Sequence, residues 1–186
     1  YVVGGCGGDI AWHTEFDTME VADRKVLATD VALYTEAVRH FATADVVPLD
    51  WRATAREFRA TVERYAQAAG THFDLAPSLA AVADLEAACV SFYAAVDEGA
   101  IAADKANSAL VAVARSLIPI NFVRGPRFTH DPALNTPALP TIEPALRLAD
   151  HGPETIGFAK AQLMRGQNRL VAALQDAVDA LNSARG

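Results

Sequence analysis

Apolar positions recur through most of this 186-residue chain at alternating spacings of three and four residues. Such spacing is typical of helices that bury one face, because about 3.6 residues make one helical turn. The pattern predicts helices over residues 24–43, 50–69, 78–98, 103–118 and 153–181, and a short helix over residues 141–149. Only residues 1–5 resemble a strand. We therefore expect residues 46–186 to form an all-α helical bundle.

Residues that commonly begin or stop helices mark several of these predicted ends. Asp23 and Ser78 are suitable N-caps, because a short polar side chain accepts a hydrogen bond from a free backbone N–H of the first turn. The second helix is expected to start at Asp50. Gly70 is a suitable stop for the second helix. Pro119 is expected to end the fourth helix, since proline lacks the N–H that continues the hydrogen-bonding pattern.

Two features interrupt the helical pattern. Residues 119–140 contain five prolines and little periodicity, which predicts a long loop of the kind that is usually functional or disordered. Gly166 lies inside the last predicted helix, where glycine costs about 1 kcal/mol relative to alanine. We expect Gly166 to mark either a close approach of another helix or a bend.

Composition narrows the classes of function. The chain is 52% hydrophobic and has a formal net charge of −7, with acidic and basic residues interspersed. The basic patch of a nucleic-acid-binding protein is not visible, and no apolar run approaches the roughly 18 to 20 residues needed to cross a bilayer. We expect no nucleic-acid partner and no membrane span in this chain. No targeting signal indicates a compartment. The two cysteines, Cys6 and Cys89, are expected to be a small loop residue and a buried apolar residue.

The strongest candidate for chemistry is His13, which follows a glycine-rich turn over residues 4–8. A catalytic zinc site needs about three protein ligands and an open position, and His13 could supply one imidazole. Taken alone, one histidine beside a glycine turn is more often structural or solvent-facing. The glycines do not match a phosphate-binding loop, because neither Gly-Lys-Ser/Thr nor Gly-x-Gly-x-x-Gly is present.

The residues around His13 carry a family resemblance. Trp12-His13-Thr14, Asp17-Thr18, Glu20 and Asp23 together resemble the last metal-ligand segment of zinc-dependent exopeptidases of the aminopeptidase and glutamate carboxypeptidase family, whose relatives include the transferrin receptor. Residues 46–51 (Val-Val-Pro-Leu-Asp-Trp) resemble the junction into the helical dimerisation domain of that family, and residues 139–146 resemble the end of that domain. The resemblance implies that residues 1–45 are the tail of an α/β catalytic domain. It implies that residues 46–186 are a transferrin-receptor-like dimerisation domain.

The resemblance also implies a role for His13 and its neighbour. His13 would bind one of two zinc ions in a parent enzyme, whereas the other ligands and the general-base glutamate would lie upstream of this chain. The chain alone is therefore expected to contain no catalytic residue and not to bind zinc stably. Trp12 stands where some relatives have a tyrosine that stabilises the oxyanion. Because tryptophan has no hydroxyl group, Trp12 is expected to be a cleft residue or simply a packing aromatic.

The proline-rich segment bears on specificity. In glutamate-specific relatives the equivalent loop presents a Lys-Tyr pair to the substrate, and this chain has no such pair there. The polar residues that could reach a substrate pocket are Arg124, Arg127, His130 and Asn135. A peptide substrate of neutral or broad aminopeptidase-like specificity is the expectation for the parent enzyme.

The expected function is thus the C-terminal part of a zinc exopeptidase, which forms a homodimer through an Ala/Leu/Val seam and supports the cleft of the upstream domain. The alternative is a free-standing helical interaction domain in which His13 binds nothing. A bundle with its own metal site is less favoured: Glu36 and His40 lie one turn apart, but the further inward carboxylates of a di-metal bundle are not evident. If residues 24–43 belong to the catalytic domain, their apolar positions Leu27, Val31, Val38 and Phe41 should pack on the bundle or on a second copy, or be partly exposed.

Overall fold

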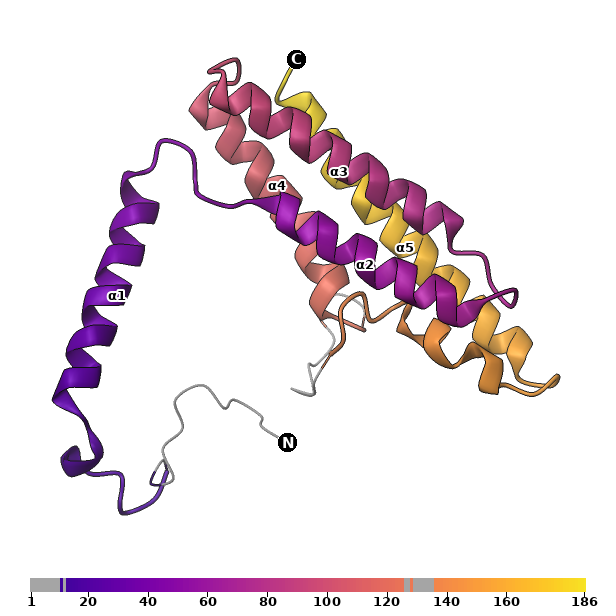
Figure 1. Cartoon of the computed structure of the whole chain (residues 1–186), viewed down its shortest axis with the longest axis horizontal. Coiled ribbons are helices and arrows are strands. Elements are labelled where there is room, and N and C mark those ends of the chain that lie inside the picture. Colours follow the sequence, from indigo (N-terminus) through magenta and orange to yellow (C-terminus); the bar gives the residue numbers. More distant parts are fainter. Residues whose placement is uncertain (1–10, 12, 126–127, 129–135) are drawn as a thin grey trace. The chain divides into compact units, whose positions relative to one another are not determined.

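The computed structural model describes residues 11, 13–125, 128 and 136–186. The described residues divide into two compact units: unit 1 extends to Pro48, and unit 2 begins at Leu49. Figure 1 shows the chain coloured along its sequence.

Unit 1 contains a short 3-10 helix, η1 (Met19–Val21), and one long helix, α1 (Arg24–Thr43). Asp23 is the N-cap of α1, as predicted, because its carboxylate accepts hydrogen bonds from the backbone N–H groups of Lys25 and Val26. All residues of α1 are described, and none of them is buried. Leu27, Val31, Val38 and Phe41 are all at least half exposed.

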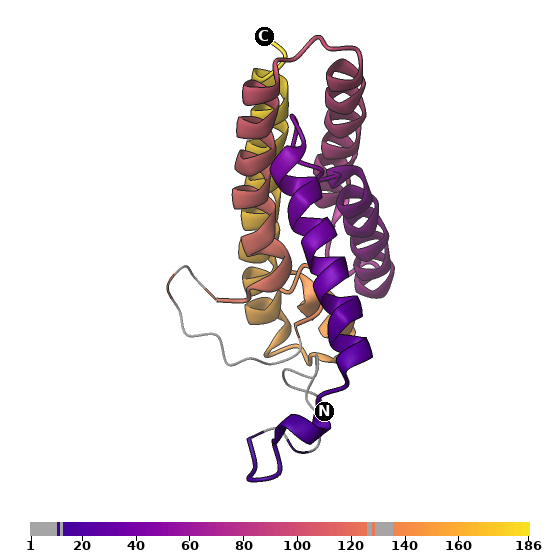
Figure 2. The ribbon, with the colours of Figure 1, turned by 90° about the vertical axis from the view of Figure 1, so that its left-hand side faces the viewer.

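Unit 2 is a bundle of α2 (Trp51–Ala69), α3 (Ala76–Asp97), α4 (Ala103–Phe122), the 3-10 segment η2 (Glu143–Asp150) and α5 (Ile156–Ser183). The long helix α5 packs against both α3 and α4, while α2 packs against α3 and η2. Figure 2 shows α4 and α5 running side by side. The described residues form helices and no strand. The predicted all-helical bundle is therefore confirmed.

Apolar residues from every element of unit 2 form its core. The largest fully buried side chains include Phe58, Tyr65, Leu85, Phe92, Leu110, Leu117, Leu148 and Leu163. Each such side chain gains about 1.5–3 kcal/mol from leaving water. Cys89 is also fully buried, as predicted for this residue.

The hydroxyl group of Tyr93 ties the start of α2 to α3. It donates a hydrogen bond to the carbonyl oxygen of Leu49 (2.5 Å) and accepts one from the backbone N–H of Trp51 (3.0 Å). Asp50 caps α2 by accepting a hydrogen bond from the N–H of Arg52, and Gly70 follows its last turn with a φ of 53°. Both ends of α2 agree with the sequence prediction.

The start of α3 differs from the prediction. Ser78 is not an N-cap but a buried residue of the first turn, and its hydroxyl has no hydrogen-bond partner among the described residues. The helix begins at Ala76, where Asp74 accepts a hydrogen bond from the backbone N–H of Ala76 (2.8 Å). Pro77 follows in the first turn, a position where proline costs no helical hydrogen bond.

The end of α4 was also predicted wrongly. Pro119 lies inside α4, and the helix continues to Phe122. The last turn is held by tertiary contacts: Ile120 and Asn121 are buried, and the side-chain oxygen of Asn121 accepts a hydrogen bond from the N–H of Leu139 (3.3 Å). These contacts offset the roughly 3 kcal/mol that an interior proline costs a helix. A second difference is smaller, since α5 begins at Ile156, three residues after Pro153.

The helix α3 is long enough and apolar enough to cross a membrane, judged by length and composition alone. A search for unbroken apolar runs misses it, because Asp84 and Glu86 interrupt the run. The core helix of a protein that does not enter a membrane passes the same test. This property therefore neither establishes nor excludes a membrane span. Only 33% of the most apolar 18-residue window of α3 is buried within the structure.

Candidate functional site

His13 lies in a tight turn of unit 1. The N–H and the hydroxyl of Thr14 both donate hydrogen bonds to the carbonyl oxygen of Ala11, at 2.9 and 2.6 Å. His13 has a φ of 63° and is exposed. Few residues other than glycine adopt this left-handed conformation, although histidine is among those that adopt it more often. The turn therefore presents the histidine at the surface. Trp12 lies outside the described residues.

The described residues do not complete a metal site around this histidine. Among them, no group of three or more His, Cys, Asp or Glu side chains is placed to hold a metal ion. Glu36, one turn from His40, instead pairs with Arg39, whose Nε lies 2.8 Å from the carboxylate. This hydrogen bond lowers the pKa of Glu36 below its ordinary value. Glu36 thus belongs to an exposed ion pair on α1.

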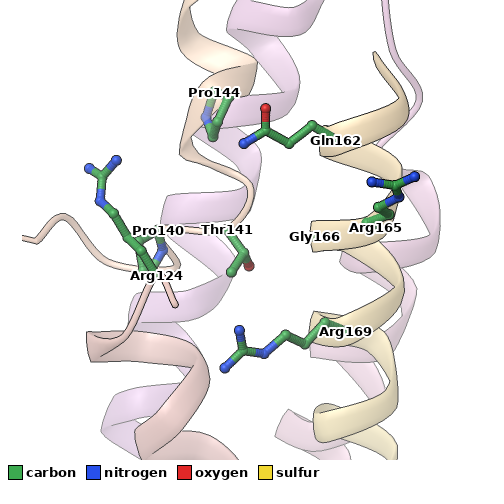
Figure 3. Close-up of a pocket in the computed structure, with 8 residues that line it drawn as sticks. All are labelled: Arg124, Pro140, Thr141, Pro144, Gln162, Arg165, Gly166 and Arg169. Carbon is green, nitrogen blue, oxygen red and sulfur yellow. The ribbon is translucent and has the colours of Figure 1, made fainter. Parts of the chain in front are cut away.

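Unit 2 contains a pocket of about 710 Å³ between α5 and residues from the proline-rich segment and the start of η2. Figure 3 shows its walls. One wall is a face of α5. The opposite wall comes from Arg124, which follows α4, and from Pro140, Thr141 and Pro144, which lie before and at the start of η2. We name it the arginine pocket; it is lined by Arg124, Pro140, Thr141, Pro144, Gln162, Arg165, Gly166 and Arg169.

Gly166 determines how closely the two walls approach. A β-carbon at this position would lie 2.8 Å from the carbonyl carbon of Thr141, and still closer to its oxygen. Only glycine permits this approach without a shift of the backbone. The sequence predicted either the close approach of another helix or a bend at Gly166; instead, the backbone of the segment before η2 approaches this residue.

The α5 wall has a simple origin in helical spacing. Gln162, Arg165, Gly166 and Arg169 follow the spacing i, i+3, i+4 and i+7, which places them on one face of a helix. In Figure 3, Gln162 and Arg169 extend from α5 toward the opposite wall. The helix therefore presents polar side chains on both sides of the contact at Gly166.

Three arginines line this pocket, and their guanidinium groups differ in direction and in partners. In Figure 3 the guanidinium of Arg169 extends between the two walls, whereas that of Arg124 extends away from α5. Arg169 donates hydrogen bonds to the carbonyl oxygens of Gly125 (3.1 Å) and Pro119 (3.5 Å). Arg124 pairs with Glu143 at 3.6 Å. Arg165 is exposed and has no hydrogen bond or ion pair with any described residue. None of the described residues that line the pocket is acidic. Among the described residues, Arg165 and Arg169 therefore have no acidic partner in this pocket.

Of the substrate-pocket candidates from the sequence, Arg124 lines this pocket. Arg127, His130 and Asn135 lie outside the described residues. Sequence reasoning missed Gln162, Arg165 and Arg169, because a polar face on a long helix ordinarily faces solvent. Gly166 was the available signal: a glycine that is unfavourable in a helix, placed between two arginines, indicates that another segment passes there.

A second surface feature lies on α3. Ala80, Ala83, Ala87, Val90 and Ala94 recur at spacings of three and four, and all are exposed or partly exposed; we name these residues the α3 face. The opposite side of the helix is buried through Val82, Leu85, Cys89 and Phe92. A helix that is apolar on all sides is normally covered on all sides. The α3 face therefore lacks the cover that its composition indicates.

Comparisons with known proteins identify no relative of this chain. No protein-family model, no curated protein and no solved structure matches the chain. The function is therefore argued from the residues and geometry of the chain itself.

Proposed function

We propose that unit 2 is a dimerisation domain whose α3 face packs against the α3 face of a second copy, within the C-terminal part of a zinc-dependent exopeptidase. The observation that carries the dimerisation proposal is the composition of α3. This helix is apolar enough for complete burial, yet only a third of its most apolar window is covered by its own chain. Covering the exposed remainder would remove apolar surface from water, at about 25 cal/mol for each Å².

The pattern of small residues on the α3 face suits a second copy of the same helix. Alanine at spacings of three and four lets two helix backbones approach closely in a near-antiparallel packing. In an antiparallel pair centred between Ala87 and Val90, Ala87 faces Val90 of the second copy, and Ala83 faces Ala94. The two copies of Asp84 then lie apart. Such an arrangement is self-complementary, as a two-fold dimer requires.

The first test is the molar mass of the chain in solution. Size-exclusion chromatography with light scattering should give the mass of a dimer at micromolar concentration. Val90→Glu should raise the dimer dissociation constant at least about tenfold, because two carboxylates would lose water near the two-fold axis. Val111→Glu on α4 is the matched control, since Val111 is also exposed (42%) but does not belong to the α3 face.

Three results would contradict this proposal. The wild-type chain could have the mass of a monomer at high micromolar concentration. Val111→Glu could dissociate the dimer as effectively as Val90→Glu. The chain could instead float with neutral lipid vesicles in a manner that Val90→Glu abolishes, in which case the α3 face would cover itself with lipid and not with protein.

The zinc exopeptidase part of the proposal is supported by the residues around His13 and by the backbone of that turn. A non-glycine residue in the left-handed region is often found where a side chain must be presented for function. The described residues alone do not fit a zinc site, since His13 has no group of further ligands beside it. The remaining ligands would have to come from a segment upstream of this chain. We therefore derive no catalytic step within this chain.

The His13 proposal predicts a change in zinc content. The test uses the polypeptide that includes this chain together with the segment that precedes it in the reading frame. Elemental mass spectrometry should find about two zinc ions in each chain, and His13→Ala should lower that content toward one. His151→Ala is the matched control, because His151 is also exposed and lies after η2. Zinc content that His13→Ala leaves unchanged, or a longer chain that holds no zinc, would contradict the exopeptidase proposal and favour a free-standing interaction domain.

A further inference from the structure

We propose that the arginine pocket binds a compact anion that carries a phosphate or diphosphate group. This inference goes beyond the proposed function and does not depend on it, because the pocket is built entirely from unit 2. The three arginines, the contact at Gly166 and the dimensions of the pocket are the observations that carry it.

The charges of the lining residues indicate an anionic ligand. The chain as a whole is acidic, with a formal net charge of −7, yet three of the eight described lining residues are arginine and none is acidic. Glu143 compensates one of these charges through Arg124. Like charges that share one pocket repel each other in the absence of a counter-ion. A multiply charged anion would remove that repulsion between Arg165 and Arg169.

The hydrogen bonds of Arg169 orient its guanidinium group without neutralising it. Its two acceptors are the carbonyl oxygens of Gly125 and Pro119, which carry no formal charge. Figure 3 shows the side chain extending from α5 into the space between the two walls. A guanidinium held in this way costs little additional entropy when it binds a ligand. Arg169 therefore places a positive charge at a fixed position in the pocket.

Arg165 supplies a second positive charge, on a side chain that no described residue holds in place. It lines the same pocket one turn before Arg169, it is exposed, and no described residue accepts a hydrogen bond from its guanidinium. All of its donors remain available for a ligand. Because a guanidinium presents two parallel N–H groups, it matches two oxygens of a phosphate better than a lysine ammonium does.

The dimensions of the pocket fit a small molecule. Its volume of about 710 Å³ falls within the roughly 300–1,000 Å³ of typical ligand pockets. Gln162 adds an uncharged amide on the same face of α5, and Thr141 adds a hydroxyl group on the opposite wall. These groups can hydrogen-bond the uncharged part of a phosphorylated molecule. The site is therefore suited to more than a free ion.

The test is a calorimetric titration of the whole chain with inorganic pyrophosphate at low ionic strength. The wild-type chain should bind saturably, and Arg165→Gln should weaken binding by about tenfold, the effect expected for one charge-assisted bidentate contact. Arg115→Gln is the matched control: Arg115 is an exposed arginine of α4 that does not line the pocket, so the same change of net charge should alter affinity less than twofold.

Further variants separate directed recognition from general charge. Arg165→Lys keeps the charge but loses the paired N–H groups, so it should bind several-fold more weakly than the wild type. Far-UV circular dichroism should show all three variants folded, because neither Arg165 nor Arg115 has a partner among the described residues. Glutarate, a dicarboxylate, should bind more weakly than pyrophosphate. The proposal is overturned if the wild type shows no saturable binding, if Arg115→Gln weakens binding as much as Arg165→Gln, or if glutarate binds as tightly as pyrophosphate.

Discussion

Replacing Gly166 by alanine should lower the free energy of unfolding by about 2–4 kcal/mol, because the new β-carbon would overlap the carbonyl group of Thr141. Rotation of a side chain cannot relieve this overlap. The new β-carbon is attached directly to the backbone of α5, and the group that it meets is the backbone carbonyl of Thr141. The substitution also removes the helical cost of glycine, a gain of about 1 kcal/mol that offsets only part of the loss. Urea unfolding followed by circular dichroism measures the difference.

Gly157→Ala is the matched control for this prediction. Gly157 lies in the same helix, and a β-carbon there would meet nothing within 4 Å. The control should therefore stabilise the chain by up to about 1 kcal/mol. A Gly166→Ala chain as stable as the wild type would show that Thr141 does not pass this close to α5. The two walls of the arginine pocket would then lie farther apart than described.

Alkaline pH should destabilise the chain strongly, because two buried acids one turn apart on α3 resist ionisation. Burial raises the pKa of the Cys89 thiol from 9.0 to about 12, and burial likewise raises the pKa of the Tyr93 hydroxyl from 10.0 to about 12. In the unfolded chain both groups would lose their protons at their ordinary pKa values. For Cys89 the difference corresponds to about 4 kcal/mol.

The direction follows from the count of bound protons. Between pH 9 and about 12 the unfolded chain has released these protons while the folded chain retains them, so the free energy of unfolding falls as the pH rises. The contribution is fully present below pH 9 and is lost by about pH 12. Urea unfolding at pH 8 and pH 11 measures the loss, which should reach several kcal/mol.

Substitutions identify the groups responsible for this loss. Cys89→Ala should reduce the difference in stability between pH 8 and pH 11, even if it lowers stability at both. Tyr93→Phe should also reduce the difference, whereas Tyr34→Phe should leave it unchanged because Tyr34 is 71% exposed on α1. If the loss in the Cys89→Ala and Tyr93→Phe chains equalled that of the wild type, burial of these two groups would not be its cause.

The helices could be predicted from the sequence wherever local chemistry determines them. The apolar spacing and the caps Asp23, Asp50 and Gly70 placed α1 and α2 within a residue of their actual bounds, because capping is a contact between neighbours in the chain. Ser78 and Pro119 were misassigned. The end of α4 beyond Pro119 depends on a partner farther along the chain, through the contact between Asn121 and Leu139. Ser78 is instead buried in the first turn of α3, and Asp74 bonds the backbone N–H of Ala76 at the start of that helix.

The candidate sites divide in the same way. Arg124 was selected from the sequence as a residue that could reach a pocket, whereas Arg165 and Arg169 were not, although all three line the same pocket. Nothing local distinguishes an arginine on a pocket wall from one on an open surface. The distinction arises because Thr141, which precedes Gly166 by 25 residues, lies close to it in the folded chain.

The sequence by itself determined that this chain forms helices, where most of them begin and end, and that a histidine follows a glycine-rich stretch. The tertiary structure alone decided which helix faces lie against one another, that one side of α3 is left without cover, and that three arginines line one pocket. The physical reason is the separation along the chain over which each interaction acts. Helical periodicity and capping act over at most one or two turns of the chain, whereas burial and clustering of charge depend on segments that only folding brings together.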